Sequence, residues 1–198
     1  MGGQSRTRAS ERKRIATCNA ILEATSLLIA EKGVAGFTLS EVAARGKINR
    51  SLIYHYYRDR ENLIFEAIRF VVNRFDQIRL TRGNDDVEQN IRLHIEHPEI
   101  GRFIFNLMLT GRPLPNLSRR ITDAIAELER LKGVASIPST VDPTFAVISG
   151  WLVQLAWSCA REEIARLLDL SPEEADRRFI ANTRATRSLF GRLPAADR

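Results

Sequence analysis

The short segment from Arg50 to Tyr56 carries side chains that could recognise a nucleic acid. A guanidinium group can bond a guanine edge with two N–H groups, an apolar side chain can contact a thymine methyl, and tyrosine hydroxyls can hold phosphates. The segment offers all of these groups: Arg50, Ser51, Leu52, Tyr54, His55 and Tyr56. If Ile53 and Tyr57, four residues apart, face inward with Ile48, these groups share the exposed face of one short helix.

Two short helices joined by a tight turn are expected to position this face. Thr38 is followed three residues later by Glu41, a capping-box signature that predicts a helix beginning at Leu39. The turn is expected at Gly46, because glycine tolerates backbone angles that other residues avoid. Asn49 then offers a side-chain oxygen to cap the second helix. Residues 38–63 are therefore predicted to form a helix-turn-helix that runs into a third helix.

This stretch resembles the helix-turn-helix of the TetR family of bacterial repressors. The residues that match the family pattern are Thr38, Val42, Ala43, Ile48, Asn49, Ile53, Tyr54, Tyr57, Arg60, Glu61 and Leu63. The sequence departs from the pattern twice: Gly46-Lys47 replaces the usual Ala-Gly of the turn, and Ser51-Leu52 replaces the usual Gly-Thr of the recognition helix. The second departure alters the expected operator without removing the fold. An ordinary helical corner, stabilised by its tyrosines, is the alternative interpretation.

The positive charge of the chain is concentrated at its start. The 198 residues carry a net charge of +6, and residues 1–60 hold 11 Lys and Arg against 5 Asp and Glu, whereas the rest holds 19 of each. A local basic excess is typical of a phosphate-binding surface. Residues 1–14 form a basic arm, predicted to be either a solvated tail or a minor-groove contact, with Arg6, Arg8, Arg12, Lys13 and Arg14.

The remaining pattern predicts an all-α chain of about nine helices. The first helix should end near Lys32 and face inward with Ile15, Cys18, Leu22, Thr25 and Ile29. Asp59 should cap a long helix from Arg60 to about Thr81, with an apolar seam of Ile64, Ile68, Val71, Phe75 and Ile78. Later helices are expected near 87–97, 98–110, 116–132, from Asp142-Pro143 onward, and 171–190. We expect residues 1–63 to bind DNA and residues 64–198 to bind a ligand and dimerise.

The resemblance implies a ligand pocket among the middle helices and a four-helix dimer interface from the last two. Pocket residues, for which plain core packing is the alternative, are expected to be Phe75, His94, Phe103, Leu107, Met108, Phe145, Trp151 and Gln154. Interface residues are expected to be Ala156, Trp157, Ala160, Phe179, Thr183, Thr186 and Phe190. Residues 145–160 are apolar nearly all round, so a second copy of the chain could cover a face that one copy leaves open.

Other classes of protein receive little support. The chain has no Gly-rich phosphate loop, Gly-x-Ser-x-Gly elbow, His-Glu-x-x-His or Cys-x-x-Cys, so no enzyme, cofactor or metal site is expected. Cys18 and Cys159 are expected to be free thiols, which suits a reducing cytoplasm. The first 14 residues lack the apolar core of a signal peptide, and the apolar run 145–160 is short for a bilayer, so no membrane partner is expected.

The sequence therefore predicts a dimeric, cytoplasmic, TetR-like transcriptional regulator, a repressor of a palindromic operator in double-stranded DNA that a small, mostly apolar effector releases. Base edges should be met by Arg50, Ser51, Leu52 and His55, and the rest of the DNA surface, mainly phosphate contacts, should comprise Thr38, Arg45, Lys47, Tyr54, Tyr56 and Arg60. The alternatives are a helical small-molecule sensor or carrier without operator binding, and an enzyme in a helical bundle.

Overall fold

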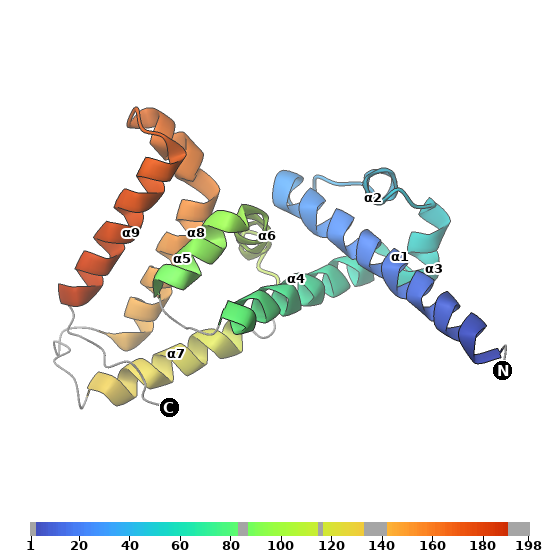
Figure 1. Ribbon diagram of the computed structural model, residues 1–198, viewed down its shortest axis with the longest axis horizontal. Helices are drawn as coiled ribbons and strands as arrows, with labels where there is room; N and C mark the ends of the chain where they lie inside the picture. Colours follow the sequence, from blue (N-terminus) through green and yellow to red (C-terminus); the bar gives the residue numbers. More distant parts are fainter. Residues whose placement is uncertain (1–2, 83–86, 115–116, 133–141, 190–198) are drawn as a thin grey trace. The chain divides into compact units, whose positions relative to one another are not determined.

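The computed structural model describes residues 3–82, 87–114, 117–132 and 142–189, and within these ranges the chain is all-α, as predicted. Figure 1 shows the helices, which in chain order are α1 (Gly3–Lys32), α2 (Leu39–Gly46), α3 (Arg50–Tyr57), α4 (Arg60–Arg82), α5 (Val87–Glu96), α6 (Pro98–Met108), α7 (Leu117–Lys132), α8 (Pro143–Leu167) and α9 (Pro172–Leu189). The described residues contain no strand. Most helix ends lie within two residues of their predicted positions.

The chain divides into two compact units. The first unit comprises Met1–Asp76 and Arg102–Pro113, and the second comprises Gln77–Gly101 and Leu114–Arg198. The first unit thus contains the helix-turn-helix, most of α4 and the end of α6. The functional boundary expected at residue 63 stays a prediction.

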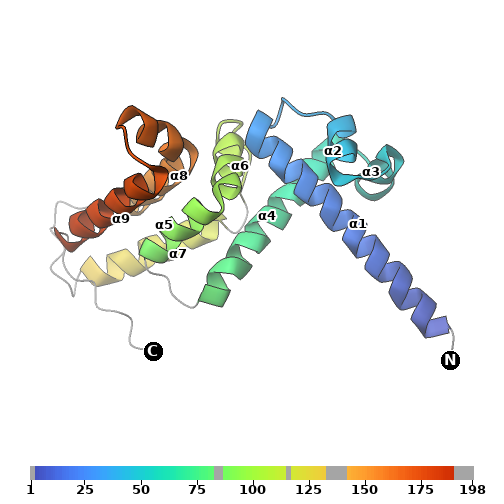
Figure 2. The ribbon, with the colours of Figure 1, turned by 45° about the horizontal axis from the view of Figure 1, so that its top comes forward.

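The core of the first unit forms where α1 packs across α2 and where α3 and α4 close the remaining side (Figure 2). Its buried side chains include Ile21, Ala24, Leu28, Ile29, Val42, Ala43, Ile53, Tyr57, Leu63, Ile64, Ile68, Val71 and Phe75. The seam predicted along α4 is buried as far as Phe75. The stripe predicted along α1 is wrong at Ile15, which is 48% exposed because the other described helices do not cover residues 8–16.

The chain start is helical rather than a separate arm. α1 begins at Gly3, and no proline or second glycine interrupts it before Lys32. Arg14 donates to the Glu11 carboxylate one turn earlier at 2.7 and 2.9 Å, an i,i+3 pair that supports the helix. Residues 3–14 consist mostly of residues that tolerate a helix well, so the helix continues through the predicted basic arm.

The end of α1 is held by α6. A helix leaves its last carbonyl oxygens without partners inside the helix, and these oxygens require other donors. The Asn106 side-chain amide donates to the carbonyl oxygens of Ile29 and Ala30 at 3.1 and 3.2 Å. Arg112, just beyond α6, donates to the Glu61 carboxylate in the first turn of α4 at 2.8 Å. The end of α6 therefore contacts both α1 and the helix that follows α3.

In the second unit, α8 packs against α5, α7 and α9. The Trp157 ring of α8 stacks on the Phe179 ring of α9, with centroids 4.2 Å apart, and its indole N–H donates to Asp176 at 2.9 Å. Arg161 pairs with the same carboxylate. These contacts hold α8 and α9 together within one chain.

Helix α8 is longer than the apolar run from which it was predicted. Its 25 residues have the length and composition of a membrane span, which the core helices of soluble proteins share. Only 22% of its most apolar window is buried within the chain. Exposed large side chains on α8 include Phe145, Leu152 and Val153, so the predicted apolar helix does leave a face uncovered.

A close approach between α6 and α8 gives the first prediction. A Cβ added to Gly101 would lie 2.0 Å from the Ser158 hydroxyl oxygen and 3.0 Å from the Ser158 Cβ, and Ser158 is buried. Gly101→Ala should therefore lower the free energy of unfolding by about 1 to 3 kcal/mol, as overpacked cores do. Urea denaturation of the purified protein measures this change.

Ser158→Ala provides the matched test of that explanation. It removes the oxygen that the new methyl would meet, at the loss of one hydrogen bond from that hydroxyl to the Leu155 carbonyl. The double variant should lose less stability than the two single losses added together. Simple additivity would show that the clash is not the cause.

Candidate nucleic-acid interface

The capping box predicted from Thr38 and Glu41 is present at the start of α2. The Glu41 N–H donates to the Thr38 hydroxyl at 3.2 Å, and the Thr38 N–H and hydroxyl donate to the Glu41 carboxylate at 2.8 and 2.9 Å. The hydrogen bond from Lys32 and those from Thr38 lower the pKa of Glu41 to about 2. Thr38 is exposed, but its hydroxyl proton already has an acceptor, which a phosphate would have to replace.

The turn between α2 and α3 differs from its prediction. The left-handed backbone conformation falls on Lys47, with φ 52° and ψ 44°, and not on Gly46, which is the last residue of α2. A Cβ on Gly46 would lie 3.3 Å from the Ala20 carbonyl oxygen of α1. Glycine is favoured at this position because it lets α2 approach α1 closely, while the lysine takes the strained conformation.

Helix α3 is anchored at its start and along its inner side. Asn49 caps it, accepting from the Ser51 N–H at 2.9 Å, as predicted. Ile53 and Tyr57 are buried, and the Tyr57 hydroxyl donates to the Cys18 carbonyl of α1 at 3.3 Å. Burial is the first cause that raises the pKa of this phenol, which therefore stays protonated as a donor. Of the three side chains predicted to face inward, Ile48 is only half-buried.

The outer side of α3 presents the predicted polar and aromatic groups. Arg50, Ser51, Tyr54 and His55 are exposed, and Leu52 and Tyr56 are half-buried. The Arg50 guanidinium donates to the Tyr54 hydroxyl at 3.1 Å, and its central carbon lies 5.7 Å from the centre of the Tyr54 ring. Tyr54 thus restrains Arg50 on the outer face. The His55 and Tyr56 rings meet edge to face at 5.0 Å.

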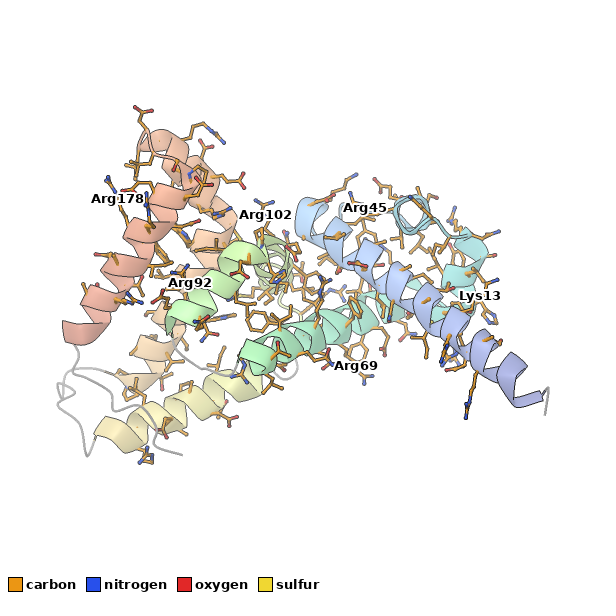
Figure 3. All side chains as sticks on the ribbon, viewed as in Figure 1. Lys13, Arg45, Arg69, Arg92, Arg102 and Arg178 are labelled. Atoms are coloured by element: carbon orange, nitrogen blue, oxygen red, sulfur yellow. The ribbon has the colours of Figure 1, made fainter. Side chains whose placement is uncertain are left out.

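Two further cations predicted to contact DNA lie on α2 and in the turn. Arg45 donates through both terminal nitrogens to the Glu31 carboxylate of α1 at 2.7 Å, which lowers the pKa of Glu31 and raises the pKa of Arg45. Lys47 is exposed. Figure 3 labels Arg45 on α2. Arg45 would have to exchange its partner to bind a phosphate, whereas Lys47 has no ion pair with the described residues.

Arg60, predicted to contact a phosphate, is bound by its own chain. Its guanidinium donates to the carbonyl oxygens of Val34 and Phe37 in the segment between α1 and α2. Its central carbon also lies 4.4 Å from the centre of the Phe37 ring, and the residue is half-buried. Arg60 therefore holds the segment between α1 and α2, and its phosphate contact stays a prediction.

Sequence reasoning omitted Arg58, which lies between α3 and α4. This residue is exposed and caps the end of α3 with φ 60°, an uncommon angle for a residue with a side chain. Its place in the sequence, directly after the predicted recognition helix, was the available signal. Arg58 adds a cation beside the outer face of α3.

The predicted pocket residues divide between the two units. In the first unit Phe75, Phe103 and Leu107 are buried and Met108 is 37% exposed; in the second unit His94 is buried, Trp151 and Gln154 are half-buried and Phe145 is 68% exposed. His94 is 3% exposed, so it belongs to the core of the second unit rather than to its surface. Which of these residues contact a ligand stays a prediction.

The predicted dimer residues differ in what they contact. Trp157 and Phe179 stack on each other, Ala156 and Thr186 are exposed, and Ala160 and Thr183 are half-buried. Phe190 lies outside the described residues. The exposed side of α8 combines the small residues Ala146, Ser149, Gly150 and Ala156 with the large apolar residues Phe145, Leu152 and Val153. Cys18 and Cys159 form no disulfide, and no cluster that could hold a metal occurs among the described residues.

Comparison with known proteins places this geometry in a family. Residues 21–67, from α1 into α4, match the family described as bacterial regulatory proteins, tetR family. The HTH-type transcriptional repressor Rv3405c of Mycobacterium tuberculosis (strain ATCC 25618 / H37Rv) is 23% identical over 155 residues, which are 75% of this chain and 78% of that protein.

Solved structures share the fold. The transcriptional regulator SCO4942 from Streptomyces coelicolor superimposes with a TM-score of 0.67 at 17% identity, covering 86% of this chain and 97% of its own. AibR, solved in complex with isovaleryl coenzyme A and operator DNA, superimposes with a TM-score of 0.57 at 15% identity, covering 83% and 96%. Together with the capped α2–turn–α3 geometry, these matches show that residues 21–67 form a helix-turn-helix segment of the tetR family type, in a chain that shares the fold of solved transcriptional regulators.

Proposed function

We propose that the chain is a homodimeric repressor that binds a palindromic operator through α3 and is released by a small, mostly apolar ligand. The observation that carries the proposal is the outer face of α3, where Arg50, Ser51, Tyr54 and His55 are exposed while Ile53 and Tyr57 anchor the helix. A relative of this chain is named a transcriptional repressor. Since the target is the chromosome, we expect the protein to act in the cytoplasm.

Arg50 is the residue we assign to base reading. A free arginine side chain loses rotamer freedom when it binds a base, and the Tyr54 hydroxyl already restrains Arg50 on the outer face. We expect Ser51, Leu52 and His55 to meet neighbouring bases. Tyr54, Tyr56, Lys47 and Arg58 are expected to contact phosphates, as is Arg45 once it leaves Glu31.

The dimer is supported by the uncovered face of α8. Two heads related by a two-fold axis can read two half-sites separated by one or more turns of DNA, which a single head cannot. Small side chains on that face would allow two α8 helices to approach closely, and α9 is held against α8 by Trp157, Asp176 and Phe179. We expect Ala156, Ala160, Thr183 and Thr186 to lie at or near this interface.

The release mechanism follows from the contacts at the end of α6. Asn106 and Arg112 link this end to α1 and to the first turn of α4, directly after the recognition helix. A ligand that moved the end of α6 would therefore change the position of α3. Such a ligand must bind the two states with different affinities. The AibR structure, which holds both a coenzyme A ester and operator DNA, supports a small-molecule effector.

The test of the DNA-binding face is selection of duplexes from a random pool, followed by binding measurements on the winner. Wild-type protein should select a palindrome. Arg50→Ala should lose about 1 to 3 kcal/mol on the selected site and relax one base position, because a bidentate base contact is lost. Tyr54→Phe keeps the ring and removes the hydroxyl that accepts from Arg50 and is expected to contact a phosphate, so it should weaken binding less than Arg50→Ala and by similar amounts on selected and random DNA. Equal losses on selected and random DNA for Arg50→Ala would refute its base-reading role.

Arg60→Ala separates a structural role from a phosphate contact. Since Arg60 donates to two carbonyl oxygens, its loss should lower the free energy of unfolding by about 1.5 to 3 kcal/mol. The salt dependence of DNA binding should keep its slope. A slope reduced by about one, with stability unchanged, would instead indicate a phosphate contact.

Gly150→Arg tests the dimer. A Cβ at Gly150 meets no atom within 4 Å, so the isolated chain can accommodate the substitution. A charged side chain on the uncovered face of α8 should shift the protein to monomers in analytical ultracentrifugation and weaken binding to the full palindrome. Ala126→Arg, which adds the same charge on an exposed part of α7, is the control and should stay dimeric. A dimeric Gly150→Arg protein would refute this interface.

A further inference from the structure

The first turns of α1 are a helix without a packing partner among the described residues. Residues 3–14 form about three turns, roughly 18 Å at the rise of an α-helix, and Figures 1 and 2 show them projecting beyond α2 and α3. Every side chain from Arg8 to Ala16 is exposed, and Thr17 is the first that is half-buried. The hydrophobic core therefore does not require this part of the helix.

The charge of this projection is strongly positive. Residues 3–14 contain five Lys and Arg and one acidic residue, Glu11. Glu11 is occupied by Arg14. Arg8, Arg12 and Lys13 form no ion pair with the described part of the chain. The projection thus offers cations and little apolar surface, which suits a polyanion rather than an apolar partner.

The projection starts beside the recognition helix. The Tyr57 hydroxyl of α3 bonds the Cys18 carbonyl, one helical turn after Arg14. Glu11 first, and then to a smaller extent the neighbouring Cys18 and Tyr56, raise the pKa of Arg14, which agrees with a position close to α3. Lys13 is labelled on this part of α1 in Figure 3. The cations of α1 therefore lie within about three helical turns of the point where α1 contacts α3.

The helical conformation decides which part of DNA this surface can reach. The minor groove of B-DNA is about 6 Å wide, whereas an α-helix with its side chains is about 10 to 12 Å across. A disordered arm could enter that groove, but a folded helix cannot. The major groove admits one α-helix and is the expected place of α3, so the sugar-phosphate backbone, which carries about one charge per 1.7 Å of duplex, is the surface that we expect residues 3–14 to contact.

We propose that residues 3–14 of α1 form a second DNA contact, in which Arg8, Arg12 and Lys13 bind the phosphate backbone of double-stranded DNA flanking the half-site read by α3. The contact rests on the proposed operator binding and extends it outward. It adds affinity without adding sequence preference, because phosphates carry no sequence information. It also makes the DNA footprint longer than the palindrome.

The experiment compares two duplexes: the selected palindrome trimmed to its ends, and the same palindrome with about ten arbitrary base pairs added on each side. Wild-type protein should bind the flanked duplex at least about tenfold tighter at low salt. The triple variant Arg8→Ala, Arg12→Ala, Lys13→Ala should lose this gain, keep its affinity for the trimmed duplex, and show a salt slope on the flanked duplex lower by about 2 to 3 per protomer.

Two further variants serve as controls. A control triple variant removes the same charge from exposed positions in the second unit: Arg92→Ala, Arg130→Ala and Arg166→Ala. This variant should still bind the flanked duplex more tightly than the trimmed one. Ser10→Pro keeps every charge but interrupts the helix, and it should lose the gain. A Ser10→Pro protein that keeps the gain would indicate a flexible arm and overturn the helical contact.

The outcomes separate this inference from the proposed function. If the protein bound the trimmed palindrome tightly and bound the flanked duplex no tighter, the α1 contact would be overturned. The proposed operator binding through α3 would stand. Equal losses for the α1 triple variant on both duplexes, or for the control triple, would also overturn it. If no palindrome were selected, the proposed operator binding would be refuted, and the α1 contact with it.

Discussion

The burial of Ile53 and Tyr57 beneath α3 is the constraint on which the DNA-binding surface depends. An eight-residue helix is not stable in water by itself, because helix nucleation costs more than two turns of hydrogen bonds return. The two inner side chains, the Tyr57 bond to Cys18 and the Asn49 cap hold α3 against α1. Because these contacts use only the inner side of α3, the side chains on its outer side are free to contact DNA.

The helix ends of the first unit explain how the remaining elements maintain this arrangement. The Thr38–Glu41 box fixes the start of α2, Gly46 lets its end approach α1, and Arg60 bonds the connecting segment between α1 and α2. Asp59 accepts from the Asn62 N–H and fixes the start of α4. Asn106 supplies donors to the end of α1. The position of α3 is thus set by backbone capping as much as by the apolar core.

Capping residues and apolar spacing predicted the helices from the sequence, but they did not predict the role of every residue at the site. The caps at Thr38, Asn49, Asp59 and Asp142 depend on residues at most three apart, so the sequence contains them directly. The left-handed Lys47 was missed because the need for glycine at position 46 comes from the approach of α1, a long-range contact. Arg60 was assigned to phosphate because its acceptors, Val34 and Phe37, lie more than 20 residues away.

The cations of the first unit fall into two groups with different availability. Arg14 and Arg45 are paired with Glu11 and Glu31, while Arg8, Arg12, Lys13, Lys47 and Arg58 have no carboxylate partner among the described residues. Exposed ion pairs contribute little to stability because solvent screens them, so a phosphate can compete for Arg14 and Arg45 at small cost. Pairing then restrains these side chains in the free protein without removing them from the DNA surface. The half-buried contacts of Arg60 are different, because their loss would leave two carbonyl oxygens without this donor.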